Sequence, residues 1–166
     1  MTVFCISGSL RIGSSNTQLL QTLIQTAPSQ AMASLYALLE SVPIYNPDKE
    51  RQHAPHPALV ALRTSILTAD LILFSSPEYA HSLPGVLKNA LDHLVPSGEL
   101  SGKRVALVSP SLRGQQGQQA LATVVQAADA RLLRYDDTQI AFPIAEAAAD
   151  AYLSPQAFWQ YILDNE

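Results

Sequence analysis

The chain has 166 residues, a formal net charge of −4 and 48% hydrophobic residues, which suffices for one domain with an ordinary buried core. No cluster of Lys and Arg is longer than a pair, so neither nucleic acid nor an anionic membrane surface is a predicted partner. No apolar run approaches the roughly 18 residues that a membrane-spanning helix needs. These features predict one compact domain without a nucleic-acid or membrane partner.

The first half of the chain alternates short apolar runs with helical patterns. Val3–Ile6 predicts a buried strand rather than the apolar helix of a secretory leader. Asn16 is expected to cap a helix that ends by Ala27, because Pro28 disfavours helical backbone in the residue before it. The further predicted elements are a strand over 33–37, an irregular loop over 40–57 and a helix over 59–68.

The second half repeats this alternation. Leu71–Phe74 is the clearest buried strand and ends in Ser75-Ser76. Pro84 stands where a helix-initiating proline is expected, and Pro96-Ser97-Gly98 should end that helix. The remaining predicted elements are a helix over 85–94, a strand over 105–108, a helix over 118–130, a fifth strand within 131–141 and a helix over 155–163.

The regular alternation of strand and helix predicts an α/β fold. A parallel sheet with helices on both faces is the architecture that such an order favours. No Gly/Ser-rich linker divides the chain, so we expect residues 1–166 to form a single domain. Three of the strands end in serine-rich loops, and the loops at the carboxyl ends of parallel strands meet at one edge of the sheet, where ligands bind.

The loop after the first strand has the composition of a phosphate site. The N-terminus of the following helix offers unpaired N–H groups and a partial positive charge. Arg11 adds a full positive charge for a phosphate. The hydroxyl and amide side chains that add further donors are Ser9, Ser14, Asn16 and Thr17.

Two better-known phosphate motifs do not fit this loop. A P-loop requires Lys where Ser14 stands, and without that lysine a triphosphate site lacks its main charge. The dinucleotide fingerprint requires Gly where Leu10 stands. The residues therefore favour a cradle for the phosphate of a mononucleotide, while a plain turn with a helix cap is the structural alternative.

A second segment gives the chain a resemblance to a known family. Gly8-Ser9-Leu10-Arg11, followed by Ser14 and Asn16, stands at the expected distance from Pro77-Glu78-Tyr79 and from the run Pro84–Asp92. This combination resembles the NADPH-dependent FMN reductase family, which includes quinone, azo-dye and chromate reductases. The resemblance implies a flavodoxin-like three-layer sandwich with a five-stranded parallel sheet in the order 2-1-3-4-5.

The resemblance also implies the roles of individual residues. Those implied to hold the FMN phosphate are Ser9, Arg11, Ser14, Asn16 and Thr17. Those implied to lie along the flavin ring, partly through their backbone, are Pro77, Glu78, Tyr79 and Ala80. The loop after the fourth strand is implied to border the ring's pyrimidine edge through Ser109, Ser111 and Gly114, where a flexible turn with a helix cap is the alternative. This sequence departs from the family at Ala80-His81, where Asn usually follows the Tyr, and at Gln118, where a second Gly is usual.

The activity implied is reduction of a small-molecule electron acceptor by NADPH or NADH through bound FMN. No catalytic side chain or metal is required, and the His53/His56 pair lacks a third metal ligand at useful spacing. Family members are commonly homodimers or homotetramers, and we expect the same here. The single Cys5 cannot form an internal disulfide and fits a reducing cytoplasm. A flavodoxin-type electron carrier and a module that has lost FMN remain as alternatives.

Overall fold

The computed structural model describes residues 1–52, 54–134, 141–145 and 151–165. Within these residues one parallel sheet has the order β2-β1-β3-β4-β5, which confirms the predicted α/β fold and its strand order. The strands are β1 (Thr2–Ser7), β2 (Met32–Tyr36), β3 (Leu71–Ser75), β4 (Arg104–Ser109), β5 (Arg131–Leu133) and β6 (Ala141–Pro143).

The last position of the sheet differs from the prediction. One strand was expected within 131–141, but two short strands lie along the same side of β4. Arg104 pairs with Arg131 of β5, whereas Leu107 pairs with Ala141 of β6, also in parallel. Residues 135–140, between them, lie outside the described residues. The edge of the sheet is therefore built from two segments on successive halves of β4.

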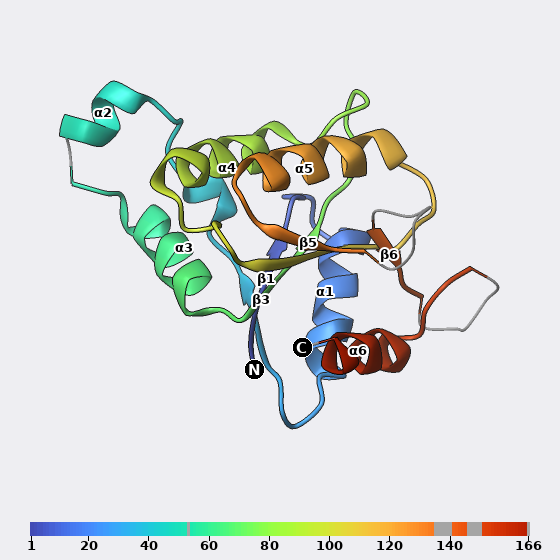
Figure 1. Cartoon of the computed structure of the whole chain (residues 1–166). Helices are drawn as coiled ribbons and strands as arrows, with labels where there is room; N and C mark the ends of the chain where they lie inside the picture. The colour runs from blue at the N-terminus through green and yellow to red at the C-terminus, as the bar shows by residue number, and fades with distance from the viewer. Residues whose placement is uncertain (53, 135–140, 146–150, 166) are drawn as a thin grey trace.

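Helices cover both faces of the sheet, and Figure 1 shows α1 and α6 on the side opposite α4 and α5. The helices are α1 (Ser15–Gln25), the 3₁₀-helix η1 (Leu39–Ser41), α2 (Pro47–Gln52), α3 (Pro57–Thr68), α4 (Gly85–Ser97), α5 (Gln115–Ala127) and α6 (Pro155–Asp164). Among the described residues, none of these helices combines the length and the apolar character of a membrane span.

The core divides between the two faces because side chains alternate along each strand. Val3 and Cys5 belong to the apolar cluster that includes α1 and α6, whereas Phe4 and Ile6 belong to the cluster that includes α3, α4 and α5. Since both faces are covered, the central strands are continuously apolar, as the sequence indicated. Burial also raises the pKa of the Cys5 thiol to about 12, which keeps it protonated and unreactive.

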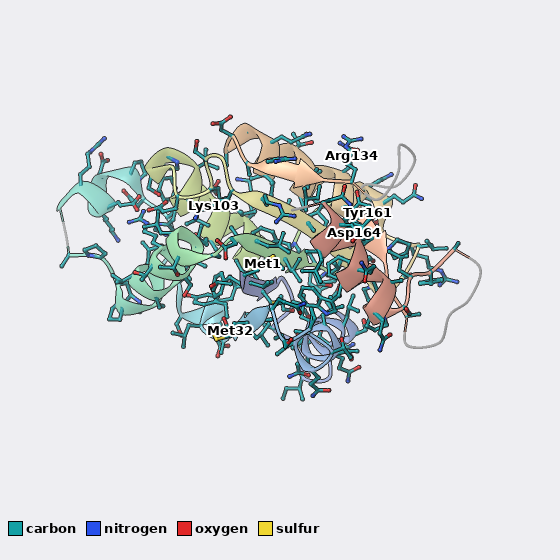
Figure 2. The ribbon with its side chains drawn as sticks, turned by 60° about the horizontal axis from the view of Figure 1, so that its bottom comes forward. Met1, Met32, Lys103, Arg134, Tyr161 and Asp164 are labelled. Carbon is teal, nitrogen blue, oxygen red and sulfur yellow. The ribbon has the colours of Figure 1, made fainter. Side chains whose placement is uncertain are left out.

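The amino ends of the strands lie at the edge away from the serine-rich loops. In Figure 2, Met32, Met1 and Lys103 mark the amino ends of β2, β1 and β4 in the order of the sheet. Lys103 Nζ donates to the carbonyl of Ala69, at the end of α3, at 3.0 Å. Such contacts satisfy carbonyls that a helix end leaves unpaired, so Lys103 has a structural role at this edge of the sheet.

Helix starts were less predictable than helix positions. Asn16 was expected to cap α1, but Ser14 is the N-cap and Asn16 lies buried in the first turn. Pro84 was expected inside α4, but it is the residue before the helix. In both cases the residue does lie at the start of the helix, but at a neighbouring position to the predicted one.

Three further boundaries also differ. The stretch 40–57, expected to be irregular, contains part of η1 and all of α2. Helix α5 begins at Gln115 instead of 118. Helix α4 continues beyond the expected residue 94, through Pro96, and ends at Ser97. Gly98 is its C-cap, and its φ of +81° is the left-handed conformation that glycine favours there.

Candidate functional site

The three serine-rich loops converge on one cavity of about 320 Å³ at the carboxyl ends of β1, β3 and β4. We call it the loop cavity. Its lining residues are Ser15, Asn16, Ser76, Pro77, Glu78, Ser109, Pro110, Ser111, Arg113 and Gly114. Because these residues come from three separate parts of the chain, the parallel sheet is what brings them together.

The predicted site residues fall into two groups. Those that line the loop cavity are Asn16, Pro77, Glu78, Ser109, Ser111 and Gly114. Those that lie in the same loops without lining it are Ser9, Arg11, Ser14, Thr17, Tyr79 and Ala80. Four lining residues were missed, namely Ser15, Ser76, Pro110 and Arg113. Each of them is adjacent in sequence to a predicted residue, and that adjacency was the signal available.

The end of β1 and the end of β3 are held tightly together. The Gly8 N–H donates to the Ser75 carbonyl at 2.8 Å, and a Cβ on Gly8 would lie 2.5 Å from Ser76 Oγ. Asn16 Oδ1 accepts a buried hydrogen bond of 2.9 Å from Ser75 Oγ. The glycine of the first loop thus permits the close approach of two protein loops, and Asn16 joins α1 to β3.

The rest of the first loop leaves the N-terminus of α1 without a side-chain cap. Ser14 is buried, and its hydroxyl makes no capping hydrogen bond. The Thr17 and Ser7 hydroxyls are 2.7 Å apart and share a hydrogen bond, whereas Arg11 is exposed and donates to the Gly13 carbonyl at 3.3 Å. The first turn of α1 also contains no acidic residue. Its N–H groups are therefore suited to an anion.

The second loop makes a tight turn directly after Glu78. Tyr79 and Ser82 exchange two backbone hydrogen bonds of 2.9 and 3.0 Å. Ala80 and His81 between them have φ values of +49° and +60°. Two consecutive positive φ values are typical of a turn that Asn-Gly prefers, so the Ala80-His81 departure lies at a conformationally demanding position.

The third loop is organised around Glu78. Ser109 Oγ donates to the Ser111 carbonyl at 2.7 Å, which closes the start of the loop. Gly117 N–H donates to Glu78 Oε2 at 2.7 Å. A Cβ on Gly114, or on Gly117 in the first turn of α5, would lie 3.3 or 3.0 Å from Glu78 Cβ. Both glycines therefore allow the close approach of this side chain.

A second cavity, of about 340 Å³, lies beside α2 and is lined by Glu50, Arg63 and His93 among other residues. Arg63 donates to the Glu50 carboxylate, and His93 Nδ1 lies 3.3 Å from Glu50 Oε1. Burial raises the pKa of Glu50, but the hydrogen bonds from His93 and Arg63 outweigh burial and hold that pKa below its ordinary 4.5. This cluster fastens α2 to α3 and α4.

His53 and His56 were the two histidines considered as metal ligands. His56 Nδ1 accepts from the Ala58 N–H at 3.2 Å and thereby caps α3. His53 lies outside the described residues. Within the described residues, no group of three or more metal-ligating side chains is present.

The sheet order, with a cavity at its carboxyl edge, defines a flavodoxin-like domain. The profile of the family described as NADPH-dependent FMN reductase matches residues 1–146. This chain belongs to that family.

Individual relatives agree with this assignment. An NAD(P)H-dependent FMN reductase of Pseudomonas aeruginosa is 41% identical over 66% of this chain and 59% of its own length. A quinone reductase of Escherichia coli is 33% identical over 68% of this chain and 61% of its own length. This chain thus spans about three fifths of these relatives. The solved structure of a flavoenzyme NAD(P)H:(acceptor) oxidoreductase from Paracoccus denitrificans is 26% identical, covers 99% of this chain and 93% of its own, and has a TM-score of 0.76.

Proposed function

We propose that this chain binds FMN in the loop cavity and uses NADPH or NADH to reduce a small electron acceptor, such as a quinone, free flavin, azo compound or metal oxyanion. The observation that carries the proposal is the convergence of all three serine-rich loops on one cavity beside an uncapped helix N-terminus. Family membership supplies the identity of the cofactor. This chain spans only part of the length of its relatives, so their activity is proposed for it.

The residues at the α1 end fit the phosphate of FMN. The uncapped first turn of α1 offers N–H donors, and Ser15 and Asn16 line the cavity there. Arg11 and Ser9 lie in the loop leading to this turn and supply charge and a further hydroxyl. Their part in the proposed mechanism is to bind and orient the cofactor through its phosphate.

The residues at the other end fit a flat ring system. Pro77 and Glu78 of the second loop line the loop cavity together with Ser111 and Gly114 of the third, and Tyr79 and Ala80 follow Glu78 in the second loop. When bound, FMN supplies the redox chemistry by accepting hydride and passing electrons on. We assign no catalytic side chain, because the residues of the loop cavity need only bind, orient and exclude water.

We also propose that the protein forms a homodimer or homotetramer whose interface adjoins the flavin. Ile12 of the first loop is 98% exposed, and Ile44, which precedes α2, is 83% exposed. Covering both side chains in a subunit interface would remove apolar surface from water. A partner subunit would also narrow the access to the loop cavity. Sedimentation of the purified protein tests the association.

The last helix and the single cysteine bear on the extent of the domain and on its location in the cell. Trp159 of α6 donates to the Leu23 carbonyl of α1 at 3.0 Å, so the last helix packs into the same core as the first. This supports our proposal that residues 1–166 act as one FMN-binding domain. The buried free thiol of Cys5 supports a cytoplasmic location.

The test is an absorbance spectrum of the purified protein, recorded before and after NADPH is added under anaerobic conditions. We expect a flavin spectrum that NADPH bleaches and that a quinone restores. A protein that is colourless and takes up no added FMN would refute the proposal. Bound flavin that NADPH fails to reduce would instead favour the electron carrier.

A further inference from the structure

We propose that Glu78 is a positioning residue whose carboxylate caps helix α5 and thereby fixes the second and third loops, which both line the loop cavity, relative to each other. Glu78 belongs to the second loop, and α5 follows the third. The inference rests on the proposed function for its effect on FMN, but the cap itself is a property of the protein alone.

The cap is visible in the geometry of the first turn of α5. Gly114 is the N-cap residue and has no side chain with which to satisfy the first N–H groups. The Gly117 N–H, three residues on, donates to Glu78 Oε2 at 2.7 Å. This N–H is the one that an N-cap side chain usually satisfies. Glu78 thus supplies from a distant loop the bond that Gly114 cannot make.

The charge of Glu78 suits this position. A helix N-terminus carries a partial positive charge that a nearby carboxylate stabilises. The first turn of α5 contains no acidic residue of its own. Glu78 is therefore the carboxylate that meets this helix end, and it comes from another loop.

The third loop is shaped to receive the Glu78 side chain. A Cβ on Gly117 would lie 3.0 Å from Glu78 Cβ and 3.1 Å from the Ser82 carbonyl oxygen. A Cβ on Gly114 would lie 3.3 Å from Glu78 Cβ, and Gly114 has a φ of +80°. Both glycines therefore allow α5 to approach the second loop as closely as the carboxylate bond requires.

The second carboxylate oxygen is also directed at the protein. Glu78 Oε1 lies 3.5 Å from Nδ1 of His81, in the turn that continues the second loop. Among the described residues, only Oε2 is held by a hydrogen bond, from the Gly117 N–H. We therefore expect Glu78 to act on a ligand chiefly through the placement of the loops.

The experiment compares full-length wild type with E78A, E78Q and D70A. Asp70 is the matched control, because Asp70 Oδ2 accepts from the Thr2 N–H at 2.6 Å, a carboxylate–backbone bond at the opposite edge of the sheet. Each protein is stripped of flavin and titrated with FMN, and amide hydrogen exchange at Gly117 is measured without flavin. A glutamine can still accept from Gly117 through its amide oxygen.

We expect E78A to weaken FMN binding about tenfold and to speed exchange at Gly117, in line with the loss of a helix cap. E78Q should restore most of both properties, and D70A should leave both close to wild type. Wild-type FMN affinity and Gly117 exchange in E78A would overturn the proposal. Equal loss of affinity in E78A and E78Q with unchanged exchange would also overturn it, since the charge would then act on the cofactor directly. If the wild type takes up no FMN, the proposed function fails, and the exchange at Gly117 alone decides the cap.

Discussion

Ser75 Oγ and Asn16 Oδ1 are joined by a hydrogen bond of 2.9 Å that connects the end of β3 to the first turn of α1 beneath the loop cavity. Ser75 has no solvent exposure, and Asn16 is buried. A buried polar group that loses its partner incurs its full desolvation cost. This pair therefore holds the end of β3 and the start of α1 together at the loop cavity.

We expect N16A to lower the free energy of unfolding by about 1–3 kcal/mol, because it leaves the Ser75 hydroxyl buried and unpaired. It should also weaken FMN binding, since Asn16 lines the loop cavity. Urea unfolding and FMN titration measure the two effects. S101A is the control, because the Ser101–Asp129 bond of 2.8 Å is exposed and should contribute little.

The close approach at Gly8 gives a second prediction. G8A places a Cβ 2.5 Å from Ser76 Oγ and 3.0 Å from Leu87 Cδ2, so we expect a loss of about 1–3 kcal/mol from overpacking and a weaker FMN complex. G85A is the matched control, because a Cβ at Gly85 has no atom within 4 Å and the residue begins α4. Thermal unfolding of both variants should show a loss in G8A only.

The Ala80 departure should be correctable. Asn tolerates a φ of +49° better than Ala does, so we expect A80N to raise the free energy of unfolding by about 0.5–1 kcal/mol. Ala151 also has a positive φ, of +77°, but lies outside the three loops. A151N should therefore raise the free energy of unfolding by a similar amount and leave the FMN affinity unchanged. A decrease in the free energy of unfolding for A80N would show that the positive φ of Ala80 does not strain this turn.

The lowered pKa of Glu50 predicts acid sensitivity around α2. A carboxyl whose pKa is depressed in the folded state stabilises the fold above its unfolded pKa and loses that contribution as pH falls through the folded value. We therefore expect the Glu50 contribution to be complete at neutral pH and to disappear below the ordinary 4.5. The Tyr45 N–H donates to Asn89 Oδ1 at 2.8 Å, so its protection against exchange, relative to the intrinsic rate at each pH, should fall with acid as the segment before α2 loosens.

The E50Q variant should flatten this acid dependence, because a glutamine does not titrate. D48N is the control, since Asp48 and Arg51 form an exposed pair on the same helix, and exposed pairs contribute little. An unchanged pH profile in E50Q would show that another group controls the loosening.

The amino-acid sequence by itself determined the class of fold and the meeting of three serine-rich loops at one edge of the sheet. Continuous apolar runs such as Leu71–Phe74 can be buried only in a sheet covered on both faces, and the serine-rich loops that follow such strands must meet at one edge when the strands are parallel. Both inferences depend on local patterns, which a sequence displays directly.

Only the tertiary structure decided what individual residues in those loops do. Asn16 looked like a helix cap but pairs with Ser75, 59 residues away in sequence. Gly117 has no side chain that could predict a partner, yet its N–H donates to Glu78, 39 residues away. The physical reason is that capping, packing and hydrogen bonding of a polar side chain depend on which distant segment the sheet places beside it, and spacing along the chain carries no record of that neighbour.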